Sequence, residues 1–152
     1  MMSPVKARTG HIVIEGKKDF RELTRVYPEI HKRVVEANRP FLREPDQLLP
    51  DILLEENLRD LRGGRKPSGF NRQEAAGMRL IFPIREDRKV EFYVSRPYRC
   101  QEVVQLTESI SSVLKKSGVK HKVEYDRLPS SVRGGSSGGY APEAVSSSSS
   151  SS

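Results

Sequence analysis

Residues 78–95 read MRLIFPIREDRKVEFYVS, and this stretch predicts a β-hairpin. Apolar side chains alternate with others from Met78 to Ile84 and again from Lys89 to Ser95, which is the period of a strand with one buried face. The polar segment REDRK between the two runs supplies the turn. Because Pro83 has no N–H to donate, we expect the first strand to lie at a sheet edge or to pair weakly there.

Two further strands and two helices flank this hairpin. The stretches from His11 to Glu15 and from Val119 to Asp126 alternate like strands. Apolar residues spaced three and four apart predict one helix from Phe20 to Phe41 and another from Val103 to Leu114. Pro28 falls inside the first helical pattern, so we expect it either to kink that helix or to begin a second one.

The order of these elements predicts the fold class. Strand, helix, strand, strand, helix, strand is the ferredoxin-like split βαβ pattern, written βαββαβ. It predicts an α+β sandwich in which the two helices cover one face of an antiparallel sheet. Unrelated proteins reach this arrangement, so the pattern indicates a fold and not a family.

Residues 42–77 form an insertion where the minimal pattern has a short connection. A structureless loop of that length is unusual in a single domain, and the insertion is rich in Leu. Pro50 is a favourable residue for the start of a helix, and Gly63-Gly64 suits its end. We therefore predict a short amphipathic helix at residues 50–61, between the first helix and the second strand.

The chain is long enough for one domain of ordinary size. We place that domain at residues 10–129, after a flexible N-terminus at residues 1–9. Residues 130–152 are rich in Gly and Ser and have almost nothing to bury. They predict a disordered tail.

The composition indicates the kinds of partner the protein binds. Lys and Arg outnumber Asp and Glu by 27 to 20, and an excess of positive charge favours anionic partners such as nucleic acid.

Cys100 is the single cysteine, which excludes an internal disulfide and suits a reducing compartment. The sequence has no secretory signal and no apolar run long enough to cross a bilayer. We expect a cytoplasmic protein without membrane contact, of cellular or viral origin.

No constellation of residues predicts an enzyme, a cofactor or a metal site. His11, His31 and His121 are scattered over different predicted elements, without the paired spacing of metal ligands. Cys100 has no histidine near it in the sequence, and a lone cysteine is usually a small buried residue. The sequence also lacks a Gly-rich phosphate loop. We therefore expect a non-enzymatic protein.

The feature that best indicates a function is a cluster of arginines with interleaved tyrosines around the hairpin and its exit. Arginines contact phosphates and tyrosine rings stack on unpaired bases, so the cluster predicts nucleic-acid binding, RNA more than DNA. A second cluster of lysines surrounds the end of the last helix. The alternative, that these charges form an ordinary solvated face, stays open because acidic residues lie among them. The predicted contact residues are Arg79, Arg85, Arg88, Lys89, Tyr93, Arg96, Tyr98 and Arg99, followed by Lys115, Lys116, Lys120 and Lys122.

A structural or assembly adaptor is the alternative function. The predicted 50–61 helix carries Ile52, Leu53 and Leu61, which it can present to a protein partner or to another copy of the chain. The same helix can instead cover the open face of the sheet. The stretch from Ile12 to Arg39 resembles the start of phage head-tail connector and tail-completion proteins, which begin with a strand, a Gly and a helix broken near a Pro. That resemblance implies a component of virion assembly.

Overall fold

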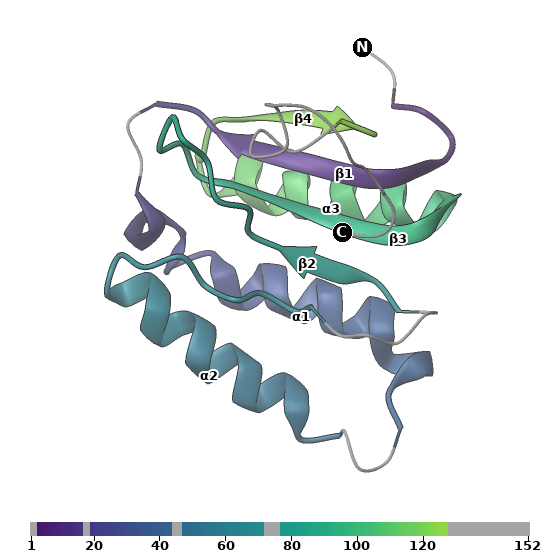
Figure 1. Cartoon of the computed structure of the whole chain (residues 1–152), viewed down its shortest axis with the longest axis horizontal. Helices are drawn as coiled ribbons and strands as arrows, with labels where there is room; N and C mark the ends of the chain where they lie inside the picture. Colours follow the sequence, from purple (N-terminus) through teal and green to yellow (C-terminus); the bar gives the residue numbers. More distant parts are fainter. Residues whose placement is uncertain (1–2, 17–18, 44–46, 72–76, 128–152) are drawn as a thin grey trace. The chain divides into compact units, whose positions relative to one another are not determined.

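The computed structural model describes residues 3–16, 19–43, 47–71 and 77–127. The chain divides into two units: the helices and strands belong to the first, and Pro83–Arg88 belongs to the second and is described by itself. The predicted tail at residues 130–152 lies outside the described residues. The elements in chain order (Figure 1) are β1 (Ala7–Ile14), the 3-10 helix η1 (Phe20–Leu23), α1 (Tyr27–Asn38), the 3-10 helix η2 (Arg39–Phe41), α2 (Leu49–Arg62), β2 (Arg79–Ile81), β3 (Glu91–Cys100), α3 (Gln101–Lys116) and β4 (His121–Tyr125).

The four strands form one antiparallel sheet in the order β2-β3-β1-β4, and with three α-helices they make an α+β fold. Ile12 at the centre of β1 lies opposite Phe92 of β3 on one side and Val123 of β4 on the other. The predicted pairing of the hairpin strands is confirmed, since Leu80 of β2 lies opposite Val94 of β3.

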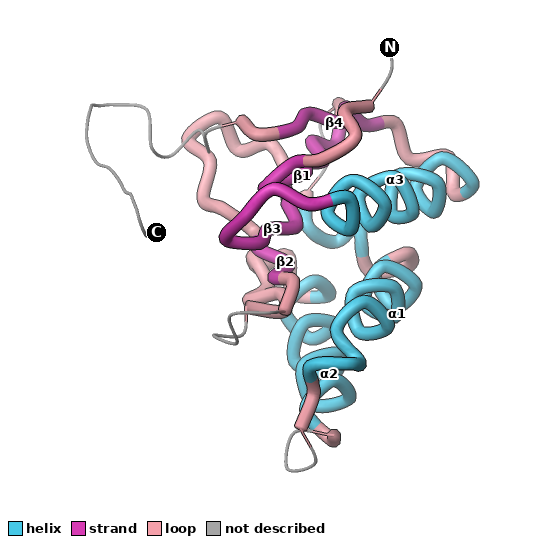
Figure 2. The backbone as a smooth tube through the Cα atoms, turned by 90° about the vertical axis from the view of Figure 1, so that its right-hand side faces the viewer, coloured by secondary structure: helices cyan, strands magenta, loops and turns pink. Residues whose placement is uncertain are grey.

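Helices α1 and α3 lie on the same side of the sheet (Figure 2) and pack against each other. Side chains alternate along a strand, so Ile12 and Ile14 of β1 share one face with Gly10 and join the hydrophobic core. A Cβ atom at Gly10 would lie 1.9 Å from the Thr107 hydroxyl oxygen of α3. The missing side chain therefore lets α3 approach the centre of the sheet. Thr9 and His11 belong to the opposite face.

The first predicted helix, from Phe20 to Phe41, is three elements, η1, α1 and η2, and Pro28 begins α1 instead of kinking a continuous helix. Asp19 caps η1 by accepting a hydrogen bond from the Arg21 N–H at 2.9 Å. Pro28 occupies the first turn of α1, where its missing N–H has no helical partner to lose. Helix α1 then ends at Asn38, two residues before Pro40.

The insertion contains the predicted helix, α2, with Pro50 in its first turn. This helix packs against η1 and α1. Asn57 holds it there, because its side-chain amide donates to the Tyr27 hydroxyl at 3.0 Å and to the Gly69 carbonyl at 2.9 Å. The main contacts of α2 are thus with other helices and not with the open face of the sheet, which was the alternative position for the insertion.

A buried chain of hydrogen bonds continues from Asn57 through Tyr27 to His31. The His31 Nε2 atom donates to the Pro50 carbonyl at 2.8 Å, which leaves its Nδ1 atom to accept from the Tyr27 hydroxyl at 3.4 Å. Burial lowers the pKa of His31, against the opposing effects of the Pro50 carbonyl and Asp51. Burial likewise raises the pKa of Tyr27. Both groups are therefore neutral in the folded protein at neutral pH.

Strand β2 is shorter than predicted. It ends at Ile81 instead of continuing to Ile84, because Pro83 cannot donate to a ladder. As expected, it lies at an edge of the sheet. Its outer side is paired with Phe70, whose N–H donates to the Leu80 carbonyl at 2.9 Å while the Leu80 N–H donates back at 2.8 Å.

Strands β1 and β3 are longer than predicted at the end of the sheet where they meet. Ala7 pairs with Cys100, so residues 7–9, which the sequence places in a flexible N-terminus, belong to β1. The Asp126 carboxylate fixes this start by accepting from the Arg8 N–H at 2.8 Å.

Among the described residues, no helix combines the length and the apolar character needed to cross a bilayer.

Candidate nucleic-acid interface

An arginine side chain supports an exposed tyrosine near the end of β3. The guanidinium carbon of Arg96 lies 4.7 Å from the centroid of the Tyr98 ring and 5.6 Å from the centroid of the Phe41 ring in η2. Arg96 is only 8% exposed, whereas Tyr98 is 48% exposed. The Arg96 guanidinium therefore lies against one face of the Tyr98 ring, while much of the ring stays exposed to solvent.

A bulge in β3 places Tyr98 outside the regular ladder. The β1–β3 pairing is irregular here, since β3 runs from Ser95 to Cys100 over the distance that β1 covers from Ala7 to Thr9. The extra residues include Pro97, which cannot donate a ladder hydrogen bond, and Tyr98, and both are exposed. Such bulges turn side chains away from the sheet.

Two exposed arginines are held beside this bulge. The Arg8 guanidinium donates to the Pro97 carbonyl at 3.2 Å. Arg99 makes an ion pair with Asp126 at 2.6 Å and donates to the Lys6 carbonyl at 3.0 Å. Lys6 is exposed as well, so three exposed cationic side chains belong to the segments that meet at this bulge. We call this set the Tyr98 surface and define it by Lys6, Arg8, Arg96, Tyr98 and Arg99.

Arg96 and Tyr93, two of the predicted contact residues, both pack on other side chains of the protein. From its buried position, Arg96 supports the Tyr98 ring and does not present its charge to solvent. Tyr93 stacks on the His11 ring, with centroids 4.7 Å apart and planes at 29°. Burial raises the pKa of Tyr93, and the nearby Glu91 carboxylate adds to this effect. Of the two predicted base-stacking tyrosines, Tyr98 is thus the one whose ring is exposed.

The remaining predicted contact residues lie at other positions. Arg79 of β2 is half-buried opposite Ser95, and Lys89 is exposed just before β3. In the second unit, Arg85 makes a two-point contact with Asp87, with Nε–Oδ1 and Nη2–Oδ2 distances of 2.8 and 2.5 Å. Arg88, also in that unit, has a left-handed backbone with φ of 62°.

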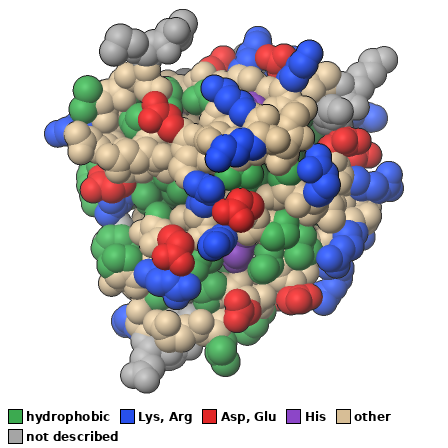
Figure 3. All heavy atoms as spheres, turned by 180° about the vertical axis from the view of Figure 1, so that it is seen from behind, with side chains coloured by type: hydrophobic (Ala, Val, Ile, Leu, Met, Phe, Trp, Pro, Cys, Tyr) green, Lys and Arg blue, Asp and Glu red, His purple; other side chains and the backbone are tan. Residues whose placement is uncertain are grey.

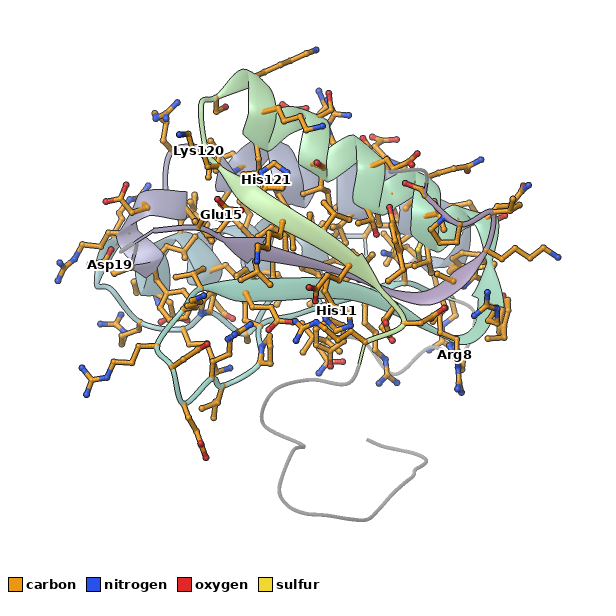
Figure 4. All side chains as sticks on the ribbon, turned by 90° about the horizontal axis from the view of Figure 1, so that it is seen from above. Arg8, His11, Glu15, Asp19, Lys120 and His121 are labelled. Atoms are coloured by element: carbon orange, nitrogen blue, oxygen red, sulfur yellow. The ribbon has the colours of Figure 1, made fainter. Side chains whose placement is uncertain are left out.

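The predicted lysine cluster is exposed, but it belongs to a different end of the sheet. Lys115 and Lys116 form the last turn of α3, and Lys120 and Lys122 follow it. Figure 4 shows Lys120 beside His121 at one end of the sheet and Arg8 at the other. On the face shown in Figure 3, basic side chains are interspersed with acidic ones and with hydrophobic patches. The positive charge is thus distributed over separate sites.

The predicted partner-binding residues of α2 differ in how far they are exposed to solvent. Ile52 is 51% exposed, Leu53 is half-buried and Leu61 is fully buried in the core. Leu61 therefore stabilises the packing of α2 and is not available to a partner. Leu48, one turn before Ile52, is 72% exposed and was not among the predicted contacts.

His11 belongs to a buried polar cluster instead of lying at the surface. Its Nδ1 atom contacts Glu91 Oε2 at 2.8 Å, and its Nε2 atom contacts the Thr9 hydroxyl at 3.0 Å. Arg127 contacts the same Glu91 oxygen. The His11 side chain is 1% exposed, so a reactant has no access to its ring nitrogens. We therefore regard the cluster as structural.

Sequence reasoning missed Lys6 and Arg8 because the segment KARTGH lacks the apolar alternation of a strand. It also missed Phe41 and Asp126 as supports of the surface, because both are brought there by pairing between distant segments. No local pattern in the sequence marks these contacts.

Comparisons with known proteins found no relative. No family model matches the chain, and the searches of curated proteins and of solved structures found no match either. Within the described parts of the chain, no group of three or more His, Cys, Asp or Glu side chains is placed to hold a metal ion.

Proposed function

We propose that this protein is a non-enzymatic accessory protein that binds single-stranded nucleic acid, RNA more than DNA, at the Tyr98 surface. The observation that carries the proposal is the Tyr98 ring, which is 48% exposed while Arg96 lies over it. An aromatic ring beside exposed cations matches the way single strands are bound, with bases stacked on rings and phosphates on Arg or Lys. Sequence-tolerant binding is the expected mode.

The Tyr98 ring is already oriented for stacking in the protein without nucleic acid. Contact with Arg96 restricts the orientations of Tyr98, so less conformational entropy is lost when a base stacks on it. Arg8 and Arg99 are likewise held by the Pro97 carbonyl and by Asp126, and their guanidinium groups have further donors for phosphate oxygens. RNA is the favoured ligand because its loops and ends commonly present unstacked bases.

We further propose the ferredoxin-like split βαβ topology for the fold, with α2 as an insertion. Its support is the position of β3 between β1 and β2, together with antiparallel pairing of every neighbour. A cytoplasmic location is proposed as well, because the buried thiol of Cys100 fits a reducing compartment.

The experiment is fluorescence anisotropy of a labelled single-stranded RNA with the full chain. Tyr98→Ala removes the stacking ring and is expected to lower the affinity about tenfold, since stacking contributes roughly 1–3 kcal/mol per base. Tyr98→Phe keeps the ring and should bind as the wild type does. Arg8→Gln should weaken binding, whereas Arg62→Gln, which removes the same charge from an exposed site on α2, should not. An affinity unchanged by Tyr98→Ala would refute the proposal.

A protein-binding adaptor, including a virion component, is the second candidate. It is favoured by the exposed Leu48 and Ile52, which lie one turn apart at the start of α2. The two candidates differ in their response to salt. Binding to phosphates weakens steeply as salt rises, whereas an apolar contact persists or strengthens.

A further inference from the structure

The outer edge of β4 carries backbone groups with no strand opposite them among the described residues. The Asp126 N–H donates to the Thr9 carbonyl at 3.0 Å, and the Glu15 N–H donates to the Lys120 carbonyl at 2.9 Å. Even-numbered residues of this segment therefore direct their backbone groups toward β1. Because these groups alternate in an antiparallel ladder, those of His121, Val123 and Tyr125 point outward.

The side chains along the same edge alternate in a self-complementary way. Lys122 and Glu124 are exposed on one face, while His121, Val123 and Tyr125 are half-buried on the face toward α3. A lysine on an edge strand normally discourages another strand from pairing with it. Here a glutamate follows two residues later, so an antiparallel strand of the same sequence presents an opposite charge to each.

We propose that β4 pairs with the β4 strand of a second copy of this chain, antiparallel and about a twofold axis at Val123. Val123 then lies opposite the partner's Val123, and His121 lies opposite the partner's Tyr125. Lys122 lies opposite the partner's Glu124, and the symmetry repeats this ion pair. The outward backbone groups of both strands meet in hydrogen-bonded pairs, and the two sheets become one continuous sheet.

Charge selects this register over its neighbours. In an allowed register, the outward backbone groups of one β4 strand lie opposite the outward groups of the other, so that they form hydrogen bonds. Three registers meet this condition near the middle of the strand. Their twofold axes pass through Lys122, Val123 or Glu124. An axis at Lys122 sets that lysine against the partner's Lys122, and an axis at Glu124 sets two glutamates against each other. Like charges directly opposite are destabilising, so Val123 is the favoured centre.

The inference does not rest on the proposed function, because Lys122 and Glu124 are not part of the Tyr98 surface. It does compete with nucleic-acid binding for Lys122, which is one of the predicted nucleic-acid contact residues. The experiment therefore includes RNA as a separate arm.

The test is sedimentation equilibrium of the full chain, freed of nucleic acid, from micromolar to millimolar concentration. The wild type is expected to form a concentration-dependent dimer. Lys122→Glu and Glu124→Lys each convert both ion pairs to like charges and should weaken dimerisation about tenfold or more. Mixing the two variants restores opposite charges at both positions, so the mixture should form heterodimers as strong as the wild-type dimer.

Two controls keep the outcome specific. Lys116→Glu makes the same change of charge at an exposed site on α3 and should leave the dimer intact. The double variant with both β4 reversals should dimerise like the wild type. Since Glu124 also contacts Arg127, thermal unfolding of each variant shows that the fold is retained, and Lys122→Glu alone suffices for the test.

Three results would overturn the proposal. One is a wild-type chain that stays monomeric throughout the concentration range. Another is a dimer that tolerates both single reversals, which would place the interface elsewhere. The third is a wild-type chain that dimerises only when RNA is added, together with a Lys122→Glu variant that no longer binds the RNA. That result would assign Lys122 to nucleic-acid binding.

Discussion

The Nδ1 atom of His11 lies 2.8 Å from Oε2 of Glu91 across the β1–β3 pair, and both side chains are removed from solvent. Arg127, two residues after the end of β4, contacts the same carboxylate oxygen. A buried carboxylate without partners is strongly unfavourable, so this contact ties together three segments that are distant in the sequence.

Replacing Glu91 tests how far this cluster stabilises the fold. Glu91→Ala leaves His11 without its carboxylate partner and Arg127 with Glu124 alone, and removing one member of a buried ionic cluster typically costs about 3 kcal/mol or more. We expect a loss of that size in the free energy of unfolding, measured by urea denaturation. Glu124→Gln, which alters an exposed partner of the same Arg127, should change stability by less than about 0.5 kcal/mol. Equal stability of the two variants would contradict a structural role for the cluster.

The buried His31 predicts a dependence of stability on pH. Burial lowers its pKa, so below the ordinary histidine value the unfolded chain binds a proton more readily than the folded protein does. The destabilisation caused by His31 is therefore absent above about pH 6.5, and it grows as the pH falls from there through the pKa of His31 in the folded protein. The unfolding free energy of the wild type should decrease over this range relative to that of His31→Gln, in which nothing titrates at this position. Parallel curves for the two proteins would contradict the prediction.

The close approach of α3 to β1 predicts a steric effect at Gly10. In Gly10→Ala the new methyl group would meet the Thr107 side chain, whose Cβ and Cγ2 atoms are 2.8 and 2.9 Å from the ideal position. Overpacking of this kind costs about 1–3 kcal/mol, to be measured as a lower midpoint of urea denaturation. Thr107→Ala removes the hydroxyl and one methyl group. The double variant should therefore be more stable than the sum of the two single effects, and strict additivity would show that the helix simply moves away.

The support of Tyr98 by Arg96 predicts that charge alone is not sufficient for binding. Arg96→Lys keeps the positive charge but replaces the planar guanidinium, which packs on both Phe41 and Tyr98, by a compact ammonium group. We expect about threefold weaker binding of single-stranded RNA, because the ring becomes less well oriented. The salt dependence should be unchanged, since the exposed arginines that contact phosphates remain. A change in the salt dependence would indicate that Arg96 itself contacts a phosphate.

Regular alternation predicted where the four strands lie in the chain, but not where each one begins and ends. Val90, Phe92 and Val94 alternate in the sequence and lie buried in or just before β3. Pro28 was predicted either to kink a helix or to begin one, and the structure has the second, because a missing N–H has only a few favourable positions. Such features depend on neighbouring residues alone, which is why a single sequence contains the information.

The Tyr98 surface was predictable only in part. Tyr98 and Arg99 stand out as an aromatic residue beside a cation, but the bulge that exposes them depends on the register between β3 and β1. Arg8 of β1 and Asp126, just after β4, are far from Tyr98 in the sequence, and their charges gave no sign of this position. The burial of Arg96 between Phe41 and Tyr98 likewise follows from tertiary packing, which periodicity does not reveal.

The pairing of Phe70 with Leu80 sets a limit on assembly. It occupies the outer side of β2, so among the described residues β4 is the edge left for the proposed pairing with a second copy. Chains that offer two open edges can add further copies without end and grow into fibres. A chain with a single receptive edge stops when two copies have met, because each has then used its only place for pairing. The Phe70–Leu80 pair, made by the insertion, therefore fits a proposed assembly that ends at two copies.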